Sequence, residues 1–249
     1  MKISFIRGSP ALMIKTGRIL VASDLHIGNE FKLARSGIHF TNATKRMAQD
    51  LLETYKKNRA RRLVLLGDIK ESIGYPPREE FEAIASFFHA FRDIDVSIVR
   101  GNHDAHLSEI LKRIGISLFP VNELIIDGIA LLHGNGMPSE AAMKKDYIIA
   151  GHSHIAVNAE GRASKGWLVA GAGKGAPNEY ARFNKRIKLI VMPAYNSLIT
   201  GVSVNDRDDW TMPLFRRKVF NASTAKAYDL NGKLRWRGTQ AARSMRIKE

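Results

Sequence analysis

Cysteine is absent from this sequence of 249 residues. Its absence excludes a disulfide framework, a cysteine-ligated zinc site, an iron–sulfur cluster and a thiol nucleophile. Long apolar segments are missing too: the longest stretch without a charged residue, 189–205, has 17 residues and contains Pro193, whereas a bilayer span needs about 20 mostly apolar residues. Lys2, Arg7 and Lys15 interrupt the N-terminus, so no signal peptide is indicated. We therefore expect a cytoplasmic protein without a membrane segment.

Acidic residues are scarce relative to basic ones. The chain has 24 Asp and Glu against 39 Lys and Arg, a formal net charge of +15. The imbalance lies mainly in the second part, because residues 1–150 carry a net +4 and residues 151–249 a net +11. A basic segment favours a polyanionic partner, with nucleic acid first. Charge alone leaves a merely solvated basic surface open as the alternative.

Five short apolar runs, rich in Val and Ile, are each followed by a cluster of Gly, Asp or His. Runs of four or five such residues are typical of buried strands. Helical patterns follow the first three runs: one begins after Thr41 or Asn42, one opens at Pro76-Pro77, and one spans Glu109–Ile114 after a Ser108 cap. This alternation predicts a parallel sheet covered on both faces. The five runs are residues 18–22, 63–66, 96–99, 129–132 and 147–150.

The length is that of one α/β domain, so we expect residues 1–249 to form a single domain. The later part of the chain has mainly strand and turn patterns. Asn231-Gly232 is a hairpin signal, because this pair favours positive φ at both turn positions. We therefore expect residues 206–249 to form basic C-terminal strands that pack on the core rather than a separate domain.

The polar clusters that follow the five runs carry the chemistry. The carboxyl ends of parallel strands lie at one edge of a sheet, where ligands bind. The ligand types present are carboxylate, imidazole and amide oxygen, a set that suits Mn²⁺, Fe or Zn²⁺, often in pairs. One carboxylate can bridge two ions about 3.5–4 Å apart, the spacing used for phosphoryl chemistry. The cluster residues are Asp24, His26, Asp68, Asn102, His103, His133, His152 and His154.

The order of these motifs resembles the calcineurin-like metallophosphoesterase superfamily. Its blocks are matched by Asp24-x-His26, Gly67-Asp68, Gly101-Asn102-His103-Asp104, His133-Gly134 and Gly151-His152-Ser153-His154. Within the superfamily, the segments 26–30 and 193–196 are similar to those of small archaeal-type (ICC-like) phosphoesterases related to the SbcD nuclease subunit. The resemblance implies a four-layer α/β/β/α sandwich, with two sheets between helices.

The resemblance also implies two metal sites that share Asp68 as a bridging ligand. The other ligands would be Asp24, His26 and His154 in the first site and Asn102, His133 and His152 in the second. His103 would contact phosphate and protonate the leaving oxygen, and Asp104 would orient His103. A bridging water would lose a proton and attack phosphorus in line. The expected cofactors are two divalent ions, Mn²⁺ first, with Fe or Zn²⁺ as alternatives.

Three positions depart from the pattern of that subgroup. Asn135 stands where a second histidine is common, Ile155 where a proline commonly follows the last histidine, and Glu71 where histidine is usual. None of the three is an expected ligand, so the metal sites implied by the resemblance are unaffected.

The expected function is hydrolysis of phosphodiester bonds in nucleic acid or nucleotides. Basic residues near the C-terminus are the candidates for contacting a strand, namely Arg216, Arg217, Lys218, Arg235 and Arg237. One alternative is a small-molecule phosphomonoesterase or cyclic-nucleotide phosphodiesterase. Another is a catalytically idle scaffold with partner proteins in a repair or RNA-processing complex, which we disfavour because every expected ligand is present. No membrane partner is expected.

Overall fold

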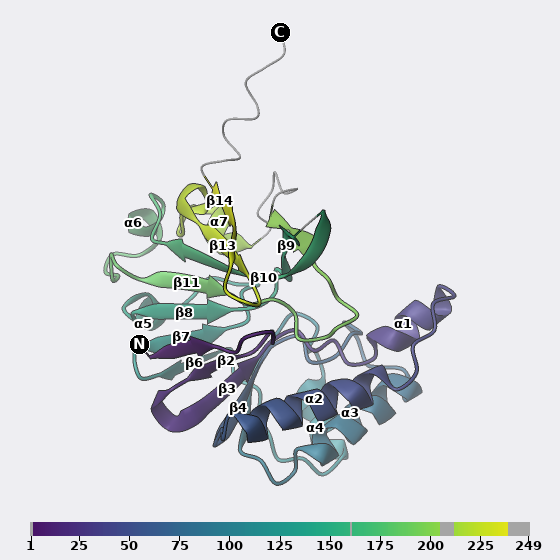
Figure 1. The fold of residues 1–249 in the computed structure, drawn as a ribbon. Helices are drawn as coiled ribbons and strands as arrows, with labels where there is room; N and C mark the ends of the chain where they lie inside the picture. The colour runs from purple at the N-terminus through teal and green to yellow at the C-terminus, as the bar shows by residue number, and fades with distance from the viewer. Residues whose placement is uncertain (1, 160, 205–211, 239–249) are drawn as a thin grey trace.

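Two β-sheets pack face to face, and helices cover their outer faces (Figure 1). The computed structural model describes residues 2–159, 161–204 and 212–238. The helices are α1 (Asn29–Arg35), α2 (Ala43–Lys57), α3 (Arg78–Ala90), α4 (Leu107–Arg113), α5 (Glu140–Met143), α6 (Ala176–Glu179) and α7 (Pro213–Arg216).

The first sheet has the order β1-β2-β3-β4-β5. Its strands are β1 (Ile3–Phe5), β2 (Leu12–Ile14), β3 (Ile19–Ala22), β4 (Arg62–Leu66) and β5 (Val96–Val99). β3, β4 and β5 are parallel, whereas β1 and β2 form antiparallel pairs at the edge. The polar segments that follow β3, β4 and β5 therefore leave the sheet at the same edge.

The second sheet has the order β12-β9-β10-β11-β8-β7-β6, and β13 pairs with both β10 and β14. Its strands are β6 (Glu123–Ile126), β7 (Ile129–Leu132), β8 (Tyr147–Ala150), β9 (Ile155–Ala159), β10 (Arg162–Gly171), β11 (Lys188–Val191), β12 (Val202–Ser203), β13 (Lys226–Asp229) and β14 (Leu234–Arg237). Strands β7, β8 and β11 run parallel to one another. The segments after β7 and β8 consequently emerge together at one edge.

Alternation along the central strands explains why both faces of each sheet are apolar. In β3, Ile19 and Val21 face the second sheet, whereas Leu20 and Ala22 belong to the core under α2, α3 and α4. Side chains two residues apart point to the same face of a strand, so a run of four apolar residues contributes to two cores. The second sheet repeats this pattern, with its outer core covered by α5, α6 and α7. The four-layer α/β arrangement is confirmed.

The five expected strands all form, but three local expectations are wrong. The sheets are mixed rather than parallel throughout, because edge hairpins extend both of them. Helix α4 begins at Leu107, with His106 rather than Ser108 before it. In the hairpin between β13 and β14, Gly232 alone of the Asn-Gly pair has positive φ. The Asp229 carboxylate accepts the backbone N–H groups of Asn231 and Lys233, which holds the chain in a wider turn.

The C-terminal strands pack on the second sheet within the described part of the chain. β13 pairs with β10, and Trp236 of β14 is buried in the outer core of that sheet. The expectations for residues 205–211 and 239–249 lie outside the described residues, and the single-domain assignment stays a prediction. Among the described helices, none is long and apolar enough to cross a membrane.

Candidate metal centre

The segments that follow β3, β4, β5, β7 and β8 meet at one edge of the sandwich. Their strands are paired in parallel register within each sheet, so their ends are level. The nine predicted site residues all lie in these segments: Asp24 and His26 after β3, Asp68 after β4, Asn102, His103 and Asp104 after β5, His133 after β7, and His152 and His154 after β8.

Two groups of side chains converge here, and each group could hold a metal ion. The first group is Asp24, His26, Asp68 and His154, and the second is Asp68, His133 and His152. In each group, one ligand atom per residue lies within 4.8 Å of all the others. Asp68 belongs to both groups, which is the geometry of a bridging ligand.

The distances within the first group are short. His154 Nε2 lies 3.2 Å from Asp24 Oδ1 and 3.1 Å from His26 Nε2. In the second group, His133 Nε2 lies 3.2 Å from Asp68 Oδ2. The two imidazole nitrogens and the carboxylate oxygen of the first group are close enough together to bind one cation.

Asn102 is the predicted ligand that stands apart, because its side chain makes no hydrogen bond or ion pair with the cluster in the described part of the chain. It lies in the turn between Gly101 and His103, and its side chain is exposed. Its place in the second group stays a prediction.

Left-handed backbone conformations gather at this edge. Asp24 (φ +56°), His26 (+42°), Asp68 (+47°), His152 (+68°) and His154 (+42°) all have positive φ. Such conformations cost non-glycine residues of the order of 1 kcal/mol each, and they persist where the surrounding structure enforces them. Asp and His adopt this conformation more often than most residues, and here it occurs at five of the candidate ligands.

Glycine is required where neighbouring segments approach the two aspartates. A Cβ on Gly101 would lie 2.2 Å from the backbone nitrogen of Asp68, and a Cβ on Gly151 would lie 1.8 Å from Ser23 Oγ and 2.5 Å from Asp24 Oδ2. These contacts explain the glycine in the Gly-Asn-His and Gly-His-Ser-His motifs.

Electrostatics keep both buried aspartates ionised. Burial by itself would raise the pKa of Asp68, but hydrogen bonding to His133 and the charge of that ring hold the pKa well below its usual range. Burial also opposes ionisation of Asp24, and contacts with His154 and His133 lower its pKa. Burial would lower the pKa of His133, but bonding to Asp68 raises it to about 9. In the second group, burial and the nearby His133 lower the pKa of His152 to about 4.

The donor set and its hydrogen bonding fit divalent cations. His133 Nδ1 lies 3.1 Å from the carbonyl oxygen of Leu66, which can only accept, so this nitrogen carries the proton. His133 Nε2 is buried and faces Asp68 Oδ2 at 3.2 Å. A metal-binding histidine has this arrangement, with one nitrogen fixed by a backbone carbonyl and the other available as a ligand.

Glu71 is the residue of this site that the sequence analysis did not assign. Its buried carboxylate lies 3.0 Å from His26 Nδ1 and also receives Lys32 Nζ (2.5 Å) and Asn29 Nδ2 (3.2 Å). Burial would raise its pKa, but these partners lower it to about 2. Glu71 therefore orients a candidate ligand as an ionised carboxylate. The signal in the sequence was its position three residues after Asp68.

The surroundings of His103 differ from the expected ones. The carboxylate of Asp104 does not orient its ring but accepts the backbone N–H groups of Gly101 (2.7 Å) and Ile69 (2.8 Å). His103 Nδ1 instead lies 2.5 Å from the carbonyl oxygen of Glu71. Asp104 thus fixes the loop that carries His103, and the main chain of Glu71 orients the ring.

Comparison with known proteins agrees with this geometry. A model of the calcineurin-like phosphoesterase superfamily domain matches residues 18–187, a range that includes every predicted site residue. The chain belongs to the calcineurin-like phosphoesterase superfamily. Members are metal-dependent phosphoesterases, and the clustered ligands of this phosphoesterase fit divalent ions. No curated protein matches the sequence.

Two solved structures were superposed on this phosphoesterase, and one of them shows the same fold. The Pseudomonas putida nuclease MPE superposes with a TM-score of 0.60 at 16% identity, covering 89% of each chain. Yfce, a phosphoesterase from E. coli, superposes with a TM-score of 0.40 at 16% identity, covering 87% of this phosphoesterase and 95% of that chain. At this identity the first likeness establishes the fold alone, and the second carries no argument.

Replacing Asp68 with asparagine tests the shared ligand. Asp68→Asn removes a charge from both groups, so we expect both ions to be lost while the fold survives. Turnover of bis-p-nitrophenyl phosphate should fall about 1,000-fold, because the ions stabilise the transition state by several kcal/mol. Elemental analysis of the purified variant measures the ions, with the exposed Asp93→Asn as the matched control. Two tightly bound ions in Asp68→Asn would rule out the bridging role.

Replacing Glu71 with glutamine tests the positioning of His26. Glu71→Gln keeps the shape but loses the charge that holds the ring, and we expect metal affinity to fall about 10- to 100-fold. Calorimetric titration with Mn²⁺ measures this affinity without turnover, and Glu82→Gln on the exposed face of α3 is the control. An affinity equal to that of the wild type would show that Glu71 only packs against the site.

Proposed function

We propose that this phosphoesterase hydrolyses phosphodiester bonds of nucleic acids or nucleotides at a centre of two divalent ions. The carboxylate of Asp68, shared between two groups of ligands, is the observation that carries this proposal. The proposed ligands are Asp24, His26, Asp68 and His154 for one ion, and Asp68, Asn102, His133 and His152 for the other.

The two groups of ligands would hold the ions that supply the electrophilic part of the chemistry. Divalent cations bound there would neutralise phosphate oxygens and lower the pKa of a water molecule to near neutrality. The ligand set has oxygen and imidazole donors without thiolate, which supports Mn²⁺, with Fe or Zn²⁺ as alternatives.

His103 is proposed as the general acid. Its ring centroid lies 4.9 Å from that of His26, so it stands beside the first group. Its backbone N–H donates to Asp68 Oδ1 (2.9 Å), which fixes its position relative to the proposed bridging ligand. Because a carbonyl oxygen can only accept, Nδ1 keeps its proton in the bond to Glu71, and the proton for a leaving oxygen would come from Nε2 of the imidazolium form of the ring.

The basic C-terminal residues support nucleic-acid binding less than the sequence indicated. Arg217 is paired with Glu179, and Arg235 is paired with the buried Asp229 at 2.7 Å. The register also places residues 216–218 away from the centre. These residues contact the segment that follows β10. The last residue of β10, Gly171, is level with the first residue of β8, whereas the metal centre lies beyond the last residue of β8. Residues 216–218 are therefore at the opposite end of the sheet from the centre.

Support for a nucleic-acid or nucleotide substrate therefore comes from the net charge and from the motif similarity to SbcD-related enzymes. The structure gives one of those similar segments a definite role. Asn196 Nδ2 donates to the carbonyl oxygens of Leu25 (2.8 Å) and His26 (3.2 Å), so segment 193–196 braces the loop that carries the first group.

A substrate panel tests the reaction class. With Mn²⁺ added, we expect hydrolysis of bis-p-nitrophenyl phosphate and single-stranded DNA to exceed that of p-nitrophenyl phosphate, because the first two are phosphodiesters and the third is a phosphomonoester. Duplex DNA and a 2′,3′-cyclic nucleotide complete the panel. Hydrolysis confined to p-nitrophenyl phosphate would favour a phosphomonoesterase, and hydrolysis confined to the cyclic nucleotide would favour a cyclic-nucleotide phosphodiesterase.

The role of His103 has its own signature in the leaving group. His103→Ala should leave the metal content near that of the wild type and lower turnover about 100- to 10,000-fold for alkoxide leaving groups. The loss should be much smaller for p-nitrophenolate, which hardly needs a proton. Equal losses with both leaving groups would assign His103 to phosphate binding rather than to proton transfer.

A further inference from the structure

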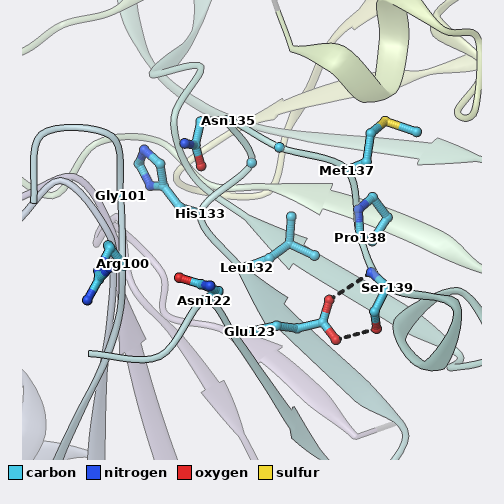
Figure 2. Close-up of a pocket in the computed structure, with 12 residues that line it drawn as sticks. Arg100, Gly101, Asn122, Glu123, Leu132, His133, Asn135, Met137, Pro138 and Ser139 are labelled. Carbon is cyan, nitrogen blue, oxygen red and sulfur yellow. Dashed lines mark hydrogen bonds between the residues drawn. The ribbon is translucent and has the colours of Figure 1, made fainter. Parts of the chain in front are cut away.

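A pocket of about 450 Å³ opens beside the metal centre, lined by the segments 100–101, 122–123 and 132–139 (Figure 2). Two of its residues connect it to the centre. His133 is a candidate ligand, and Gly101 packs against the backbone of Asp68. A group attached to a phosphate at the centre would therefore have this pocket as its neighbour.

The wall chemistry of the pocket differs from one side to the other. Met137 and Pro138 form one side together with the nearby Leu132, whereas Arg100 lies on the opposite side of the view in Figure 2. Asn122 lies between them in this view, and Asn135 lies beside His133. An apolar wall, two amides and a guanidinium are the complement of a nucleotide, which presents a flat base, polar edges and a phosphate.

Arg100 is available to bind an anion. Its side chain is exposed, and it has no ion pair or side-chain hydrogen bond among the residues that the structure describes. The only carboxylate lining the pocket, Glu123, is engaged by Ser139, whose Oγ lies 2.6 Å from Oε1 and whose backbone nitrogen lies 3.0 Å from Oε2. Glu123 is thus held in place by a neutral partner, and the guanidinium keeps its charge for a ligand.

We propose that this pocket binds the nucleoside attached to the scissile phosphate, and that Arg100 binds the next phosphate of the strand. This inference rests on the proposed function and makes it more specific. The preferred substrate is an oligonucleotide with at least two phosphates rather than a simple phosphate ester. The base lies against Leu132, Met137 and Pro138, and the amides of Asn122 and Asn135 bind its polar edge or the sugar hydroxyls.

Three substrates separate the contributions of the pocket. Bis-p-nitrophenyl phosphate has neither a nucleoside nor a second phosphate, thymidine 5′-p-nitrophenyl phosphate adds the nucleoside, and a deoxythymidine trinucleotide adds a second phosphate.

Arg100→Ala should lower the ratio of kcat/KM for the trinucleotide to that for bis-p-nitrophenyl phosphate about tenfold. Asn135→Ala should lower the ratio for the thymidine ester about fivefold. The exposed Arg92→Ala at the end of α3 is the control, and it should change neither ratio.

Unchanged ratios in both Arg100→Ala and Asn135→Ala would overturn the inference and leave the proposed function intact. If the wild type hydrolyses no diester, the proposed function fails instead, and a binding measurement then decides the role of the pocket.

In the His103→Ala background, anisotropy of a fluorescein-labelled oligonucleotide should show about tenfold weaker binding when Arg100→Ala is added. The slope of log K against log salt should also fall by about 0.7. Equal affinities and equal slopes would remove Arg100 from the nucleotide site.

Discussion

The burial of two carboxylates at one edge of the sandwich is the constraint on which the rest of the site depends. Asp24 and Asp68 are almost fully buried, and an ionised group in such a place is costly unless charged and hydrogen-bonding partners surround it. The partners come from the four loops after β3, β5, β7 and β8, and left-handed backbone occurs in two of them, at His26, His152 and His154. Cations bound here would supply part of the positive charge that the protonated His133 now provides to the two carboxylates.

The loops around the carboxylates are themselves held by buried polar contacts. Lys165 Nζ donates to the carbonyl oxygens of three successive residues, 194–196, and burial lowers its pKa to about 8. Lys70 binds the carbonyl oxygens of residues 72–74 in the same way. Tyr195 connects its loop to α2 through Asp50, at 2.6 Å. Rigid support of this kind keeps ligand positions within the narrow tolerance that metal binding and catalysis require.

Much of this arrangement could be predicted from local patterns. A run of four apolar residues between polar clusters identifies a strand buried on both faces, and the runs of β3, β4, β5, β7 and β8 were all found in this way. Because strands of one parallel set end at the same edge, the residues that follow them could be grouped before any distance was known. The spacing of Asp and His within each motif then indicated metal chemistry, since few other functions need those residue types together.

Contacts between distant segments decided the rest. Glu71 became part of the site because its carboxylate meets His26 from another loop, and Asp104 was excluded from orienting His103 because its oxygens meet backbone amides instead. Arg217 and Arg235 each form an ion pair with an acidic side chain, so they are less available to a nucleic acid. The sequence by itself determined the strands, the edge and the ligand types, which depend on local periodicity and spacing. Only the tertiary structure decided the side-chain partners and the pocket beside His133, because these depend on contacts between distant segments that local periodicity and spacing do not specify.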